Sequence, residues 1–212
     1  MVRALTYITT AYKEGYVPPG ALSWNDADDN NAFHAKQMIM DLDGTISTEL
    51  ALYHKKEEYD DVVTMGLPFD DAGNPIPSQL GVAGAFIAKG AKNVEVAKDF
   101  IKYLIQPKVT NEYLKTGLGR WLPAFPDLVK SDPFWLDPKD PHVAAYTRQG
   151  VLDPTVPIYP VFNPGYAEAN AQQIWGAAEA DVIREGTTPQ VAAEKALKRI
   201  GEILARYPIV AS

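Results

Sequence analysis

The stretch WNDADDNNAFHAKQMIMDLDG, residues 24–44, decides how the chain is interpreted. It opens with an aromatic residue and a run of acids and amides, which is typical of a helix N-terminus because such side chains cap the first turn. The apolar run that follows predicts a buried strand, and Gly44 ends it in a tight turn. Polar side chains are therefore expected beside a strand end, where α/β proteins commonly bind ligands.

The end of this stretch, DLDGT at residues 41–45, resembles the first motif of haloacid-dehalogenase-type phosphatases. That resemblance implies a magnesium phosphatase in which Asp41 attacks a phosphoryl group and Asp43 handles the proton of the leaving group. Phosphoryl transfer of this kind also needs an acidic pair after a later strand to hold magnesium. No such pair follows the later apolar run GVAGAFIAKG at residues 81–90, so the phosphatase is kept only as the alternative.

Composition excludes several other classes. The chain has 212 residues, a net charge of −7 and no cysteine. The negative charge argues against a nucleic-acid partner, and the lack of cysteine excludes disulfides, zinc-thiolate sites and a cysteine nucleophile. The three histidines lack metal-like spacing, and the acidic run at residues 26–31 lacks the glycine and the final glutamate of a calcium loop. We expect no catalytic residue, no metal and no cofactor.

The order of predicted elements indicates an α/β protein with a small sheet. Helical periodicity occupies the first fifteen residues, and apolar runs predict three strands at residues 37–44, 61–69 and 81–90. Helices alone are predicted afterwards, ending with two long ones at Gly165–Arg184 and Pro189–Tyr207. Alternation of helix and strand followed by helices favours the α/β class.

Residues 24–44 also resemble the sugar-binding extracellular solute-binding proteins of ABC importers, which are similar to maltose- and oligosaccharide-binding proteins. The matching residues are Trp24, Asp26, Ala27, Asp28, Asn30, Ala32, Phe33, Met40 and Gly44. Lys36 replaces a frequent glycine of that family and Asp43 a frequent asparagine, which accounts for the phosphatase-like motif. The resemblance continues through residues 81–107, GRWLPAFPDLVKSDPFW at 119–135 and GTTPQVAAEKALKRIGEIL at 186–204.

The resemblance implies an incomplete periplasmic-binding-protein type II fold. Residues 1–88 would be the first segment of the C-terminal lobe, residues 89–136 a helical segment that packs on the N-terminal lobe, and residues 137–212 the closing helices. The N-terminal lobe would be missing, so the chain is expected to be a fragment. Its excursion helices are then expected to expose apolar surface and to favour self-association.

The same resemblance implies a carbohydrate-binding protein that performs no chemistry and is periplasmic or extracellular. Its partners would be a mono- or oligosaccharide and the membrane permease of an ABC transporter. Aromatic rings would stack on sugar faces, while carboxylates, amides and a guanidinium would bind hydroxyl groups. The expected ligand-binding residues are Trp24, Asp26, Asp43, Gly44, Thr45, Arg120, Trp121, Asn163 and Tyr166. For Asp26 a plain helix-capping role is an open alternative.

Overall fold

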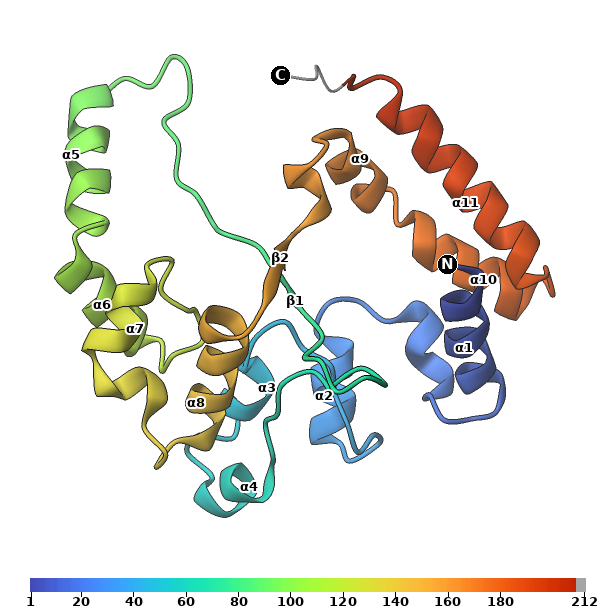
Figure 1. The fold of residues 1–212 in the computed structure, drawn as a ribbon, viewed down its shortest axis with the longest axis horizontal. Coiled ribbons are helices and arrows are strands. Elements are labelled where there is room, and N and C mark those ends of the chain that lie inside the picture. Colours follow the sequence, from blue (N-terminus) through green and yellow to red (C-terminus); the bar gives the residue numbers. More distant parts are fainter. Residues whose placement is uncertain (209–212) are drawn as a thin grey trace. The chain divides into compact units, whose positions relative to one another are not determined.

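The computed structural model describes residues 1–208 and is mainly helical (Figure 1). The chain forms two compact units: unit 1 contains residues 1–41 and the chain from residue 158 onward, and unit 2 contains residues 42–157. The helices of unit 1 are α1 (Val2–Lys13), α2 (Asp28–His34), α9 (Gly165–Ala171), α10 (Ile174–Arg184) and α11 (Pro189–Leu204). The helices of unit 2 are α3 (Ser47–Leu50), α4 (Lys56–Asp61), α5 (Val94–Leu104), α6 (Pro107–Thr116), α7 (Pro126–Ser131) and α8 (Pro141–Thr147).

Unit 1 is built on the packing of α10 against α11, with α1 and α9 covering the pair. Thr188 caps α11 by accepting a hydrogen bond from the Val191 amide at 3.3 Å, and Pro189 occupies the first turn. The interior is rich in alanine, which lets helix backbones approach closely. Its buried residues are Leu5, Ala169, Ile174, Ala178, Val182, Ala192, Ala193, Ala196, Ile200 and Ile203.

The single helix predicted for residues 165–184 is divided in two. Gln173 has a φ of 50° and a left-handed conformation, which ends α9 and starts α10 in a new direction. Left-handed backbone is uncommon for a residue with a side chain, and neither glycine nor proline marks this break. Periodicity alone therefore joined two helices that the chain separates.

Unit 2 has a smaller core around Trp135, which is completely buried and packs with Ile46, Val129 and Val143. Trp135 lies in a short 3-10 turn, Pro133–Leu136, whose cap is Asp132. Trp135 is therefore the centre of the core of unit 2.

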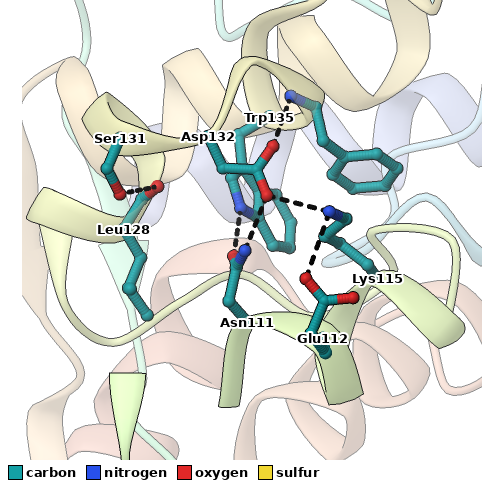
Figure 2. A network of polar contacts seen from close by, with 8 residues as sticks. Asn111, Glu112, Lys115, Leu128, Ser131, Asp132 and Trp135 are labelled. Carbon is teal, nitrogen blue, oxygen red and sulfur yellow. Dashed lines mark hydrogen bonds and ion pairs between the residues drawn. The ribbon is translucent and has the colours of Figure 1, made fainter. Parts of the chain in front are cut away.

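A polar network surrounds this buried indole (Figure 2). Trp135 Nε1 donates to Asn111 Oδ1 at 2.8 Å, and Asn111 Nδ2 donates to Asp132 Oδ2 at 2.7 Å. Lys115 Nζ lies 2.9 Å from the same carboxylate oxygen, while the other oxygen accepts the Phe134 amide. These donors hold the pKa of Asp132 below its usual value, with Lys115 as the largest cause.

The three predicted strands are not formed. Residues 38–43, 62–68 and 81–88 lie outside helices and strands, and apolar side chains within them are exposed, including Ile39, Val63 and Phe86. Two other segments pair instead: β1 (Ser78–Leu80) runs parallel to β2 (Thr155–Pro157). A strand needs a neighbouring strand for its backbone hydrogen bonds, and local sequence does not tell which segments find one.

Helix α5 carries no buried residue within the part of the chain described. Val96, Phe100 and Tyr103 are all exposed on it. For α5 this agrees with the expected exposure of apolar surface, whereas Leu128, Val129 and Trp135 of the same predicted segment are buried. The predicted lobe boundaries at residues 88 and 136 concern a larger two-lobe fold and stay a prediction.

Candidate functional site

The predicted ligand-binding residues are divided between the two units, and each group is described by itself. Unit 1 holds Trp24, Asp26, Asn163 and Tyr166. Unit 2 holds Asp43, Gly44, Thr45, Arg120 and Trp121. Within each unit, the structure brings some of these residues together with neighbours that the sequence did not single out.

The Asp43 turn is shaped by its own side chains. Asp43 Oδ1 accepts the Thr45 amide at 3.1 Å, and Asp43 Oδ2 accepts the Ser47 hydroxyl at 2.7 Å. Thr45 Oγ1 in turn accepts the Ser47 amide at 3.1 Å, at the first residue of α3. An aspartate that bonds to amide and hydroxyl groups a few residues ahead is a common way to fix a turn. The Asp43 carboxylate therefore orders the segment that leads into α3.

A second turn positions Arg120 and Trp121. Leu118 and Gly119 have φ values of 55° and 78°, so the backbone reverses there after α6. Two features of the backbone require a glycine at position 119. A Cβ there would lie 3.0 Å from Val143 Cγ1, and the backbone is left-handed. The Arg120 guanidinium lies 5.5 Å from the centre of the Trp121 ring, which is 57% exposed. This turn presents a flat aromatic face beside a cation.

Tyr146 links these two turns. It is half-buried on α8, and its hydroxyl donates to the Gly44 carbonyl at 3.4 Å. Burial raises the pKa of Tyr146, the negative charge of Asp43 raises it further, and the positive charge of Arg120 lowers it. The phenol is therefore within electrostatic reach of both charged side chains. We name the group Asp43, Gly44, Thr45, Arg120, Trp121 and Tyr146 the Tyr146 patch.

In unit 1, Trp24 and Asp26 precede α2. A Cβ at Gly20 would lie 3.1 Å from Trp24 Nε1, so the glycine lets the indole pack on the backbone. The capping interpretation of Asp26 is wrong, because the N-cap of α2 is Ala27 and it is Asp28 that accepts the Asn25 amide at 2.7 Å. Asp26 is exposed, and its side chain is not used to start the helix.

The other unit 1 residues lie at the start of α9. Asn163 Oδ1 accepts the Gly165 amide at 2.8 Å, and its Nδ2 donates to the Tyr207 carbonyl at 3.3 Å. Asn163 thus ties the start of α9 to the chain that follows α11. The ring of Tyr166 lies 4.9 Å from that of Tyr159, and its hydroxyl accepts Trp175 Nε1 at 3.3 Å.

Tyr166 and Trp175 line a pocket of about 240 Å³ between α9 and α10. Asn170 and Gln173, which both carry side-chain amides, border the same space. We name it the Tyr166 pocket; its lining consists of Tyr166, Ala169, Asn170, Gln173, Ile174, Trp175, Gly176 and Ile200. Aromatic rings, a phenol and carboxamides without a charged group suit a small neutral ligand that carries hydroxyl groups.

Sequence reasoning missed two residues of these groups. Tyr146 was not singled out, and no motif around it in the helical segment PHVAAYT marks it. Trp175 is only partly buried and lines the pocket. The signal available for Trp175 was its position nine residues after Tyr166, but the break at Gln173 was needed to bring the two together.

A larger pocket of about 950 Å³ runs along α1. Its lining comes from residues 1–16 alone and is mainly apolar, with Tyr7 and Tyr16 exposed. Specific binding needs polar groups that converge from several elements. This surface does not provide them, so the Tyr146 patch and the Tyr166 pocket are the better candidates.

The geometry offers little to phosphoryl transfer. The strand that would carry Asp41 and Asp43 is not formed, and both oxygens of Asp43 are engaged in its turn. Within residues 1–208, no group of three or more histidine, aspartate or glutamate side chains could hold a metal ion. The same part of the chain contains no helix that is both long and apolar enough to cross a membrane.

Comparison with known proteins identifies the family. The sequence pattern of the bacterial extracellular solute-binding proteins matches residues 1–145, which is more than half of the chain. A comparison with curated proteins gives no match. The matched region includes the stretch 24–44, the Asp43 turn and the Arg120–Trp121 turn. Such proteins bind a solute outside the cell and deliver it to a transport system, and this chain belongs to the bacterial extracellular solute-binding protein family.

Proposed function

We propose that the chain is part of the substrate-binding component of an ABC importer and that its solute is a mono- or oligosaccharide. The main support is the family match, together with the exposed aromatic face of Trp121 beside the hydroxyl-binding Arg120. On this proposal the protein binds its sugar without chemical change, in the periplasm or outside the cell, and presents it to a membrane permease.

The chemistry of both groups supports a sugar over a charged solute. A pyranose has apolar C–H faces that stack on aromatic rings and a rim of hydroxyl groups that need both donors and acceptors. The Tyr146 patch combines the Trp121 face with an anion and a cation, which suit adjacent hydroxyls. The Tyr166 pocket is smaller than the usual range of about 300–1,000 Å³ for drug-sized ligands, so it suits one sugar ring.

In this assignment Trp24, Trp121 and Tyr166 stack on sugar rings, and Trp175 adds a second face to the Tyr166 pocket. Asp26, Asp43 and Arg120 bind hydroxyl groups. Asn163 and the Gly44–Thr45 backbone shape the sites. Asp26 is available for this role because it does not cap α2.

We further propose the type II binding-protein fold, in which two α/β lobes close on the ligand by hinge bending. The exposed apolar residues of α5 then pack against the N-terminal lobe, and self-association is an alternative way to cover them. The exposed apolar runs at residues 38–42 and 62–68 find strand partners in the same assembly. The domain division at residues 88 and 136 follows from that fold.

A thermal-shift screen tests the solute class. The chain is heated with saturating glucose, xylose, maltose and cellobiose, and in parallel with phosphate, an amino-acid mixture and a dicarboxylate. Ligand binding to the native state raises the melting temperature by an amount that grows with the logarithm of the ligand concentration divided by Kd. We expect stabilisation by at least one sugar and by none of the charged solutes. Stabilisation by a charged solute alone would keep the family and reject the carbohydrate.

A further inference from the structure

A partly buried polar relay in unit 2 joins half-buried Glu49 and Thr64 to buried His142. His142 lies on α8 and is 1% exposed. Its Nδ1 lies 2.7 Å from Thr64 Oγ1, and its Nε2 lies 2.9 Å from the Tyr59 carbonyl oxygen. Thr64 Oγ1 also makes a hydrogen bond with the Glu49 carboxylate. Three side chains from different segments are thus connected through one hydroxyl group.

The number of protons in this relay can be counted from its partners. A carbonyl oxygen only accepts, so His142 Nε2 must carry a proton. The Thr64 hydroxyl has one proton and two neighbours, so it donates to one and must accept from the other. Two arrangements satisfy every contact: Glu49 is protonated and His142 is neutral, or Glu49 is a carboxylate and His142 is an imidazolium.

Both arrangements hold one proton more than a carboxylate facing a neutral imidazole. Without that proton, Thr64 can satisfy either Glu49 or His142, and the other contact sets two lone pairs against each other. Such a contact is costly at the His142 ring, which is buried and shielded from water. The relay is therefore complete only when Glu49 and His142 share one proton.

The other titratable groups around the relay do not supply this proton. The Tyr59 hydroxyl donates to Asp140 Oδ1 at 3.0 Å, and burial followed by the charge of Asp140 raises the pKa of that phenol. Tyr53 contacts the Tyr59 ring and also adds to the raised pKa of Tyr59. The Thr64 segment, residues 62–68, contains no charged residue, and Asp140 also caps α8 through the Val143 amide.

The relay joins α3, which follows the Asp43 turn, to α8, which carries Tyr146. Glu49 lies on α3, whose first residue bonds to Asp43, and His142 lies one helical turn before Tyr146 on α8. The Tyr146 hydroxyl bonds to Gly44 across the same two elements. The relay and the hydrogen bond from Tyr146 to Gly44 therefore connect the same two parts of unit 2.

We propose that Glu49, Thr64 and His142 form a one-proton latch that sets the spacing of the Tyr146 patch. Solute binding at that patch is then weaker when the latch loses its proton. This second statement rests on the proposed function, whereas the latch itself does not.

Nuclear magnetic resonance of the imidazole and carboxyl groups tests the latch without any ligand. In the wild-type chain we expect the His142 ring signals and the Glu49 carboxyl signal to change in one joint step as the pH is raised. In Glu49→Gln the new amide donates to Thr64, which donates to His142 Nδ1. His142 is then expected to stay neutral over the same range. Exposed His54 is the internal reference.

Two variants of Thr64 serve as controls. Thr64→Ser keeps the hydroxyl and should retain the joint step, whereas Thr64→Val removes it and should make Glu49 and His142 titrate separately. Identical His142 titrations in the wild type and in Glu49→Gln would overturn the latch. A retained joint step in Thr64→Val would overturn it as well.

The link to binding uses the sugar that gives the largest thermal shift. We expect its Kd to rise about fivefold across the joint step, the equivalent of about one hydrogen bond. The Kd of Glu49→Gln should not change over that range. If the resonance signals show the joint step but no sugar binds at any pH, the proposed function is rejected and the latch is kept. Equal pH dependence of Kd in both proteins would reject the regulation alone.

Discussion

The two units are stabilised in different ways. Unit 1 is an apolar helix assembly in which neighbouring helices meet through small side chains such as Ala192 and Ala193, and its ion pairs lie outside the core. Unit 2 relies on side-chain hydrogen bonds between segments far apart in sequence: Tyr59 with Asp140 across 81 residues, and Gln149 with the Leu67 amide across 82.

The difference shows which part of the molecule can respond to its surroundings. Apolar contacts change little with pH, whereas the network built on Asp132 depends on protonation. Residues proposed for solute binding occur in both units, but the Tyr146 patch lies among the polar networks. We therefore expect pH to act on unit 2 through the Asp132 network, and on unit 1 mainly through the Glu168–Arg206 pair outside its core.

The largest expected effect comes from the core of unit 2. Trp135→Ala removes a fully buried side chain and leaves Asn111 Oδ1 without its indole donor. We expect a loss of about 3–5 kcal/mol in the free energy of unfolding, measured by urea denaturation and circular dichroism. A loss below about 1 kcal/mol would contradict the assignment of Trp135 as the centre of this core.

The corresponding test in unit 1 is overpacking. Ala193→Leu adds three carbons where α11 meets the core, and we expect a loss of about 1–3 kcal/mol in the same assay. Val191→Leu, at an exposed position of the same helix, is the matched control and should change stability by less than about 0.5 kcal/mol. Equal effects of the two substitutions would show that the helices are not closely packed there.

The acid sensitivity of unit 2 is expected to depend on Asp132. Because its folded-state pKa is lowered, chiefly by Lys115, the stabilisation is present near neutral pH. It is lost as the pH falls below about 4 toward the folded-state value. Asp132→Asn should lower the free energy of unfolding at pH 7, by less than Trp135→Ala does. It should also reduce the decrease of this free energy between neutral and acid pH. If the free energy of unfolding of the variant decreases with acid as steeply as that of the wild type, other carboxylates cause the acid sensitivity.

The smallest expected effects concern two buried threonine hydroxyls, one in each unit. Thr9 in α1 donates to the Leu5 carbonyl at 2.7 Å, whereas Thr147 Oγ1 in α8 is buried without a hydrogen-bond partner among the described residues. Thr9→Val should cost about 1 kcal/mol, because a satisfied hydroxyl is lost. Thr147→Val should gain about 1 kcal/mol, because an unsatisfied hydroxyl is removed. The opposite signs are read from paired thermal denaturation curves.

Local signals in the sequence predicted helices well and strands poorly. Helix α11 follows from its threonine cap, its proline and its apolar periodicity, which are all local. The apolar runs at residues 37–44, 61–69 and 81–90 look like strands, but pairing is a long-range property and these runs do not pair. The pairing of β1 with β2, 77 positions apart at Ser78 and Thr155, has no local signature.

The candidate site was predictable only in part. Trp121 and Arg120 stood out as an aromatic and a cation in a turn-rich segment, and the structure places them in contact. Tyr146 could not be found, since its role depends on α8 lying against the Asp43 turn. Asp43 has a local function in that turn as well, so its type and position alone do not separate a structural role from a binding role.

The most direct test uses the four tryptophan indole N–H signals of a nitrogen-labelled sample, which report even weak binding. The sugar selected by the thermal-shift screen is added up to high millimolar concentration. We predict shifts of the Trp24, Trp121 and Trp175 signals, while the buried Trp135 signal stays in place. If none of the first three indoles moves with any sugar in the panel, the assignment of this chain to carbohydrate binding is contradicted.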